Sequence, residues 1–527
     1  MIDGPDRWTR RLGWVCGLLG LGLLVARVVQ APVEIYGDSG AGWIEHMARV
    51  QAILDIQRTG ALWPWDVVRS ADGLYPPGLH LLTCPLAALG AHSTTAAVLT
   101  GIGWLGLLAG AVAVLAHHAR GPVSAWAAVV VTLGMPALHG VATRYYYDLP
   151  MVTAIWWGAA VLVVVRSPVR AGVGAGLLLG LACLIKWSAI PLGLPIILAA
   201  AVHRRCWRTG LVVAGTSACA LGALASLDLP SWGAMGSATF QPPPGVVLRG
   251  DLATLAAGGP VGQAIAVLVS SFQSGVLVDR IGFYAARLVH AGLSPALAVV
   301  WGVWWVPWAR AKGPGLLAGM VSAVPVMGFV VVLLPPLDER FLLSLLPGLA
   351  LAAGWGRASL ATAVRAWTDR MVVVVALVVA ADFHLPPRGA TLPSWLRAES
   401  SVDRRGWGRR DEGPPVREAL RTALWSTLNT CPWRAISGTD LLIDPTGDLN
   451  WWGHQTRLAA LRGDPSWSWT VGDEGELWLR PAPPSAWASP SDPPARYTLV
   501  AEVRDPDGGA GIEIWQAPGL SPCPALP

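Results

Sequence analysis

The chain has 527 residues, of which 53% are hydrophobic and only 13% are charged, whereas an ordinary soluble domain has about 25% charged residues. Together with a mean hydropathy of +0.49, this composition excludes a soluble globular protein and indicates a polytopic membrane protein. The formal charge of +5 comes almost entirely from arginine, since lysine occurs only at positions 186 and 312. We attribute this charge to loops on the inner side of the membrane and expect no nucleic-acid partner.

Windows of about 20 residues predict eleven membrane-spanning helices. They are expected at about residues 12–29, 94–116, 123–141, 149–165, 171–187, 188–202, 209–228, 284–306, 315–334, 341–356 and 371–385. The apolar stretch from Ala171 to Ala201 is too long for one crossing and contains Lys186 and two prolines. We therefore divide it at the sequence IKWS.

Basic residues alternate between the predicted loops as the positive-inside rule expects. If the N-terminal sequence RWTRR faces the cytoplasm, the inner loops contain Arg120, Arg166, Arg170, Arg204, Arg205, Arg208, Arg310, Lys312, Arg357, Arg365 and Arg370. The outer turns contain little more than Arg144, Lys186 and Arg340. We therefore predict a protein of the cell membrane with a cytoplasmic N-terminus and, because the number of spans is odd, an external C-terminus.

Two further apolar stretches, residues 76–90 and 260–278, do not fit as full spans. If both crossed the membrane, the basic residues between 120 and 208 would move to the outside. We expect these stretches to form helices that lie in the outer face of the membrane or dip into it.

The composition changes at about residue 386 to Pro, Gly, Asp, Arg and Trp, and no further spanning run follows. Four segments alternate like strands and a fifth has helical spacing: DLLIDP, ELWLRP, RYTLVAEV, GIEIWQ and VREALRTALWSTL. The predicted fold is therefore a polytopic all-α membrane domain over residues 1–385 and an extracytoplasmic α+β domain over residues 386–527. Cys431 and Cys523 fall in the second domain, where a disulfide is permitted but not established by the sequence.

The segment EIYGDSGAGWIEHMARV places Asp38 and Glu45 directly after the first predicted span, on its outer side. Two interpretations are open. The sequence GDSG favours a turn, so that Asp38 would cap a helix beginning near Gly42. Alternatively, these acids belong to a site at the depth of the lipid headgroups, together with charged residues from other outer segments.

Four other outer segments carry ionisable or aromatic side chains, namely YPPGLH, RYYYDLP, LIKWSAIP and PPLDERF. Any one of them alone is best explained as an anchor at headgroup depth. Each ionisable group at membrane depth costs about 2.5–3.5 kcal/mol on insertion scales. The convergence of four such segments on one face therefore indicates a functional site.

In their order along the chain, these features resemble the GT-C membrane glycosyltransferases, particularly the dolichyl-phosphate-mannose protein mannosyltransferases and the bacterial lipid A aminoarabinose transferases. The resemblance covers about the first 360 residues. It rests on Asp38, the pair Pro76 and Pro77, the segment from Arg144 to Asp148, the run GLACLIKWSA and the run ERFLLSLLPGLALAAG. It implies an inverting enzyme that transfers a hexose or pentose from a polyprenyl-phosphate donor to a glycan, lipid or protein acceptor of the cell envelope.

On this resemblance, Asp38 is the expected base that removes the proton of the acceptor hydroxyl. Lys186 and Arg340, with Arg144 next, are expected to bind the phosphate of the leaving lipid. The expected substrate-binding residues are Tyr75, His80, Tyr147, Asp148, Glu339 and Glu45.

Ser39 stands where many relatives have a second acid, and no His/Cys/Asp cluster has metal-site spacing. We therefore expect no metal requirement, and no cofactor besides the lipid-linked sugar donor.

Two other classes of protein are alternatives to a transferase. A transporter or flippase of lipid-linked substrates would be expected to show internal repeats and ion sites near the midplane. A non-catalytic assembly protein of the envelope would tolerate the loss of Asp38. The sequence shows no clear repeat and its charges lie at one face, so we favour the transferase.

Overall fold

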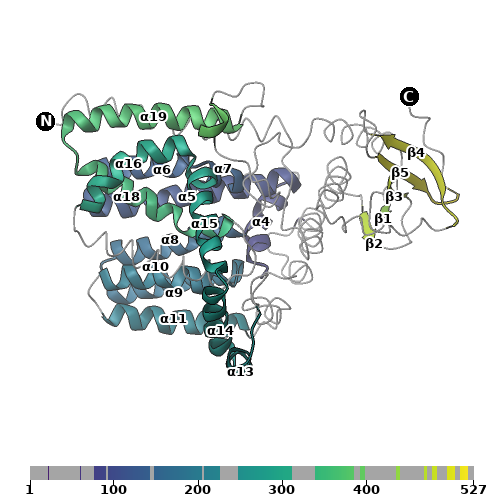
Figure 1. Ribbon diagram of the computed structural model, residues 1–527, viewed down its shortest axis with the longest axis horizontal. Coiled ribbons are helices and arrows are strands. Elements are labelled where there is room, and N and C mark those ends of the chain that lie inside the picture. The colour runs from purple at the N-terminus through teal and green to yellow at the C-terminus, as the bar shows by residue number, and fades with distance from the viewer. Residues whose placement is uncertain are drawn as a thin grey trace. The chain divides into compact units, whose positions relative to one another are not determined.

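The computed structural model describes residues 22, 60, 76–90, 93–142, 147–203, 207–225, 247–310, 339–384, 392–397, 435–438, 468–471, 477–482, 495–504 and 511–519. The described residues are mostly helical, with several apolar helices, as the sequence predicts. The helices from α6 to α19, most of α5 and the start of α4 belong to one compact unit, and the five strands belong to a second. Both sets of elements are labelled in Figure 1.

Four helices that are consecutive in the chain lie side by side in the helical unit (Figure 1). They are α8 (Asp148–Val164), α9 (Pro168–Ile185), α10 (Ala189–His203) and α11 (Trp207–Ala225). Their short connections make each helix antiparallel to the one before it. The start of α8, the end of α9 and the start of α10 therefore lie at one end of this group.

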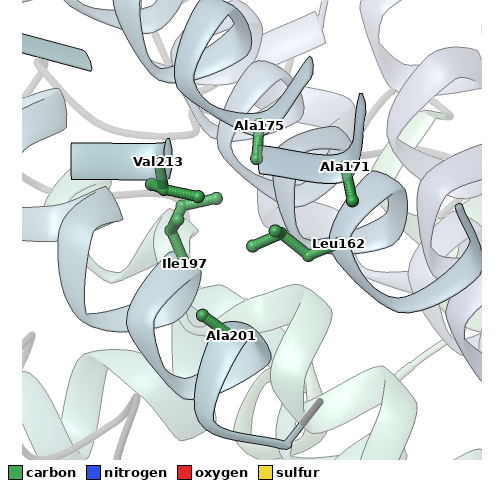
Figure 2. Packing of buried hydrophobic residues seen from close by; sticks show 6 residues of the cluster. All are labelled: Leu162, Ala171, Ala175, Ile197, Ala201 and Val213. Carbon is green, nitrogen blue, oxygen red and sulfur yellow. The ribbon is translucent and has the colours of Figure 1, made fainter. Parts of the chain in front are cut away.

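The other end of the same group is closed by a buried aliphatic cluster (Figure 2). Its members come from all four helices: Leu162, Ala171, Ala175, Ile197, Ala201 and Val213. Close packing of such side chains fixes the helices relative to one another. This cluster stabilises the end that carries no candidate site residue.

The remaining helices are α4 (Gly78–Ala88), α5 (Ser93–Arg120), α6 (Pro122–Gly134), α7 (Pro136–Ala142), α13 (Asp251–Ala257), α14 (Pro260–Gln273), α15 (Val276–Arg287), α16 (Pro295–Arg310), α18 (Leu346–Ala358) and α19 (Thr362–His384). Among them, α6, α16, α18 and α19 pack against one another, and α7 contacts α8. Shorter helical turns are the π-helix η1 (Leu288–Leu293) and the 3₁₀ helices η3 (Glu339–Ser344) and η5 (Ser394–Leu396).

A buried ion pair lies at the end of α18. Arg357 and Asp369 are 2% and 1% exposed, and the guanidinium donates hydrogen bonds to both carboxylate oxygens. Arg357 also donates to the carbonyl of Val123 at 3.0 Å, and its guanidinium lies 4.6 Å from the centre of the Trp126 ring. The pair therefore joins α18 and α19 to the start of α6.

Two predicted spans are not single straight helices. The span predicted at 123–141 consists of α6 and α7, which bend by 62° around Met135. Pro136 supplies no N–H and disfavours helical geometry at the preceding residue, so the helix stops there. The span predicted at 284–306 contains the end of α15, η1 and α16, with a break at Ser294, where φ is 67° and a proline follows.

The spans predicted at 341–356 and 371–385 are also altered. The first begins in the 3₁₀ helix η3 and continues as α18. The second is part of the longer helix α19. Apart from residue 22, the predicted spans at 12–29 and 315–334 lie outside the described residues.

Among the described helices, two are long and apolar enough to cross a membrane by length and composition, Leu99–Arg120 and Pro168–Ile185. The number rises to four if each bent pair of helices is one span. The two stretches expected at the outer face contain helices: α4 lies within 76–90, and α14 and the start of α15 lie within 260–278, with a bend of 91° between Ile265–Gln273 and Val276–His290. The number of eleven spans and the side of the membrane stay predictions.

The strands form one mixed sheet in the order β2-β1-β3-β5-β4. Their bounds are β1 (Ala435–Gly438), β2 (Ser468–Val471), β3 (Leu477–Ala482), β4 (Thr498–Arg504) and β5 (Gly511–Gln516). The segments ELWLRP, RYTLVAEV and GIEIWQ, predicted as strands, supply β3, β4 and β5. The segments DLLIDP and VREALRTALWSTL lie outside the described residues, and the domain boundary near residue 386 stays a prediction.

Candidate functional site

The candidate site includes the short connection between α9 and α10, residues 186–188. Lys186 follows the last residue of α9 in an extended conformation, with φ −156° and ψ 126°, and its N–H donates to the carbonyl of Ala182 at 2.9 Å. The next helix begins at Ala189. The break predicted at IKWS is therefore confirmed, and it places a lysine at the junction of two apolar helices.

Asp148 lies at the same end of the helix group because it is the first residue of α8. Its carboxylate Oδ1 accepts a hydrogen bond from the Lys186 Nζ at 2.8 Å. Both side chains are 2% exposed. A charge buried to this degree is tolerated only when an opposite charge or hydrogen bonds replace its water, so each residue depends on the other.

A second cation reaches the same carboxylate from a distant part of the sequence. Arg340, in η3, is 5% exposed, and its Nη1 lies 4.0 Å from Oδ2 of Asp148. The carboxylate of Asp148 is thus flanked by Lys186 on one oxygen and by Arg340 on the other. We refer to these three residues as the ion cluster.

One aromatic ring contacts the ion cluster, and two more lie on residues next to it in the chain or in contact with such a residue. The Nζ of Lys186 lies 5.5 Å from the centre of the Phe341 ring, within the range of a cation–π interaction. Tyr147, which precedes Asp148, contacts His80 edge to face, with ring centres 6.1 Å apart and an interplanar angle of 75°. Both of these rings are buried. The ion cluster and the rings of Tyr147 and His80 are thus all buried.

Gly78, the first residue of α4, lies close to the backbone of Leu184 and Ile185, just before Lys186. A Cβ added to Gly78 would lie 2.6 Å from the carbonyl oxygen of Leu184 and 2.8 Å from its carbonyl carbon. No side chain larger than hydrogen fits there without a backbone shift. Glycine after the rigid pair of prolines in PPGLH therefore lets α4 start against α9 and carry His80 to Tyr147.

Two further contacts hold the segments of the site together. The indole Nε1 of Trp156, two turns into α8, donates to the carbonyl of Ser344 at the end of η3, at 3.2 Å. The hydroxyl of Ser188, just after Lys186, lies 3.6 Å from the sulfur of Met151. These contacts fix η3 and the start of α10 against α8, so the cations are positioned by well-packed helices.

The structure brings together five predicted site residues, namely His80, Tyr147, Asp148, Lys186 and Arg340. Glu339 is the first residue of η3, and its side chain is outside what the structure describes. Four further predicted site residues lie outside the described residues: Asp38, Glu45, Tyr75 and Arg144. The roles predicted for all ten residues stay predictions.

Sequence reasoning did not identify Phe341 or Gly78 as parts of the site, and it did not pair Asp148 with Lys186. The signals were present in the printed sequence, because Phe341 directly follows Arg340 in ERF and Gly78 directly follows the prolines in YPPGLH. What was missing was the knowledge of which helix ends meet.

The chemistry of the ion cluster suits an anion. Two fixed cations in a buried site bind phosphate or carboxylate oxygens strongly, because charge-assisted hydrogen bonds are about twice as strong as neutral ones. Within the described ranges, no group of three or more His, Cys, Asp or Glu side chains is arranged to hold a metal ion. The positive charge of the ion cluster comes from the side chains of Lys186 and Arg340.

No protein-family model matches the sequence, and no match is found among curated proteins. Solved structures do match. The crystal structure of ArnT from Cupriavidus metallidurans in the apo state superposes with a TM-score of 0.51 at 15% identity, covering 95% of this chain and 98% of that one. The crystal structure of the same protein bound to undecaprenyl phosphate gives 0.53 at 12% identity and covers 98% of both chains. The predicted resemblance in fold to the GT-C membrane glycosyltransferases is therefore confirmed.

Proposed function

We propose that this chain is an inverting membrane glycosyltransferase that moves a sugar from a polyprenyl-phosphate donor to an acceptor at the outer face of the cell membrane. The observation that carries the proposal is the ion cluster, in which two buried cations meet at one end of the helices in a chain with the fold of ArnT. ArnT has been crystallised with undecaprenyl phosphate. A lipid phosphate is the ligand that such a cluster would be expected to bind.

In the proposed reaction, the acceptor hydroxyl attacks the anomeric carbon and loses its proton to Asp38. The bond between the anomeric carbon and the phosphate oxygen breaks, and the oxygen keeps the electron pair. Lys186 and Arg340 stabilise the negative charge that accumulates on the leaving phosphate. Arg144 assists them from the segment just before Tyr147.

The sugar and the acceptor are proposed to lie beside the phosphate, near the aromatic side chains of Tyr147 and His80. Tyr147 and His80 are in contact next to Asp148, and aromatic faces can stack on sugar rings. Tyr75, Glu45 and Glu339 are proposed to complete this side of the site. The acceptor is a glycan, lipid or protein of the envelope.

Replacing Lys186 by Met tests the phosphate site directly. Purified protein in lipid nanodiscs would be titrated with undecaprenyl phosphate, and we expect Lys186→Met to bind about 10- to 100-fold more weakly, because a charge-assisted contact contributes about 1.5–3 kcal/mol. Arg170→Met is the matched control: it removes one positive charge from the opposite, exposed end of the same helix. Equal affinity in the wild type and Lys186→Met would refute the assignment.

A second measurement separates transfer from transport of the donor. Polyprenyl-phosphate sugars would be supplied to the purified protein with cell-envelope acceptors, and release of free polyprenyl phosphate would be followed. A transferase liberates one lipid phosphate for each sugar transferred. A flippase moves the donor across the bilayer and leaves its glycosidic bond intact.

A further inference from the structure

The ion cluster contains a carboxylate where a phosphate is proposed to bind. Lys186 and Asp148 are both 2% exposed and are joined by a 2.8 Å hydrogen bond. Removing two such charges from water costs several kcal/mol for each ion, and their mutual attraction offsets that cost. Asp148 is therefore the counter-ion that allows a charged Lys186 to stay buried before any lipid has bound.

The position of Asp148 also sets the charge that an incoming phosphate meets. Among the residues that the structure describes, the ion cluster consists of two cations and one carboxylate, a formal charge of +1. The carboxylate lies between the cations, 2.8 Å from Nζ of Lys186 and 4.0 Å from Nη1 of Arg340. A phosphate that contacts both cations must therefore approach a negative charge as well.

The donor and the product of the proposed reaction differ in charge at this phosphate. A sugar linked to a polyprenyl phosphate is a phosphodiester with one negative charge. When the bond to the anomeric carbon breaks and the oxygen keeps the electron pair, the lipid phosphate becomes a monoester. A phosphate monoester has a second pKa of about 6 and carries about −1.5 to −2 charges at pH 7.

We propose that Asp148 is a specificity-determining residue that shifts the preference of the phosphate site toward a singly charged phosphodiester. The inference rests on the proposed function. The carboxylate of Asp148 repels a doubly charged monoester more strongly than a singly charged diester, because the Coulomb energy grows with the charge of the ligand. Asp148 thereby favours binding of the donor and release of the spent lipid phosphate from the same two cations. Lipids with more highly charged headgroups, such as diphosphate-linked ones, are discriminated against in the same way.

The test compares two lipids with the same chain whose phosphates differ in charge and by one methyl group. Polyprenyl phosphate and its phosphate methyl ester, a monoester and a diester with the same chain, would be titrated into the purified full-length protein in nanodiscs at pH 7.5. Asp148→Asn should shift the ratio of the two affinities toward the monoester by about tenfold, equivalent to about 1.4 kcal/mol. At pH 5 the monoester is mostly singly charged, so the shift should shrink.

A charge-compensated variant is the control for unfolding of Asp148→Asn. Asp148→Asn leaves Lys186 without its carboxylate, whereas the double variant Asp148→Asn/Lys186→Gln removes one charge of each sign and keeps the formal charge at +1. The double variant should bind both lipids more weakly but return the ratio toward that of the wild type. Asp369→Asn, which breaks the buried pair with Arg357 at the other end of α18, should leave the ratio unchanged.

The outcomes separate this inference from the proposed function. If Lys186→Met weakens binding of both lipids but Asp148→Asn keeps the wild-type ratio, the role of Asp148 in specificity is wrong and the phosphate site stands. An equal shift in Asp369→Asn would likewise reject it, because loosening of the helices would then explain the effect. A wild type that retains neither lipid overturns the proposed function and this inference together.

Discussion

At the scale of single residues, the site depends on a lysine placed outside helical geometry. Lys186 lies between two helices, so its backbone is extended and its side chain can turn toward Asp148 at the start of the neighbouring helix. The first turn of a helix also favours an acidic side chain, because its free N–H groups carry partial positive charge. The two ends thus place opposite charges next to each other before any ligand is considered.

The predicted base is tested by Asp38→Asn. Asparagine caps helices about as well as aspartate but cannot accept the proton of the acceptor hydroxyl. We expect normal insertion and donor binding, with turnover lower by about 10² to 10⁴, the usual contribution of a positioned general base. Turnover would be measured on purified protein as release of polyprenyl phosphate.

Asp38→Ser separates catalysis from capping. Serine is also a good N-cap, so a purely structural Asp38 should tolerate either replacement. If both variants turn over at the parent rate, Asp38 is not the base, and Glu45 becomes the next carboxylate to test.

The sequence singles out Lys186, Arg340 and Asp148 as candidates, because ionisable residues are costly at membrane depth. The structure brings these three side chains together. Their pairing was not recognised, because Asp148 was expected to orient sugar hydroxyls, and only the packing of α8 against α9 brings its carboxylate to Lys186. Which side chains share a charge is decided by tertiary packing, which a single sequence does not show.

At the scale of elements, the contact between α9 and α11 depends on glycines at every fourth position, Gly172, Gly176 and Gly180. A Cβ added to Gly176 would lie 2.6 Å from Cβ of Thr216, and one added to Gly180 would lie 2.7 Å from Cβ of Ala220. Small residues at this spacing let helix backbones approach closely in a membrane, where packing rather than hydrophobic burial drives association. The end of α9, and with it Lys186, is held in place partly by this contact.

Replacing Gly176 by Val should separate the two helices. We expect a loss of stability of about 1–3 kcal/mol, the usual cost of overpacking a well-packed interface, measured as a lower thermal unfolding temperature of the purified protein in detergent. Gly215→Ala is the matched control on α11, because an added Cβ meets nothing within 4 Å there. Unfolding of Gly176→Val at the parent temperature would mean that the close contact does not contribute to stability.

The helix boundaries followed the sequence wherever local chemistry sets them. The end of α9 and the start of α10 agree with the break predicted at IKWS. The first residue of α8 lies within one residue of the start of the predicted span. A hydropathy window averages over a local break, so it does not show the interruptions of the helices at Pro136 and at Ser294. Strands β1 and β2 were also missed, because each has only four residues and too short an alternation to recognise.

At the scale of the whole molecule, α18 separates the ion cluster from the buried pair of Arg357 and Asp369. Arg340 precedes this helix and Arg357 lies near its end, so the two are about 20 Å apart at 1.5 Å per residue. The ion cluster joins η3 to the start of α8 and to the residue after α9, whereas the pair of Arg357 and Asp369 joins α18 to α19. We propose the first as a ligand site, and the second connects α6, α18 and α19.

Helix length supports a position of the ion cluster near a membrane boundary. The 17 residues of α8 and the 18 residues of α9 extend about 26 Å, slightly less than the hydrocarbon core of about 30 Å. Their charged ends, at Asp148 and Lys186, would then lie near the edge of the hydrocarbon core, where a lipid phosphate is found. The distribution of arginines predicts that this edge is the outer one.

Cysteine labelling tests that orientation. In a variant whose own cysteines are replaced, single cysteines at Ser39 and Ser466 should react with an impermeant thiol reagent added to intact cells, because both positions are predicted to lie outside. A cysteine at Ser167, which precedes α9 at the end opposite Lys186, should react only after the cells are opened. Labelling of Ser167→Cys in intact cells, with no labelling of Ser39→Cys, would show that the topology is the reverse of the predicted one. The ion cluster would then face the cytoplasm, and the transferase would have to draw its donor from the inner leaflet.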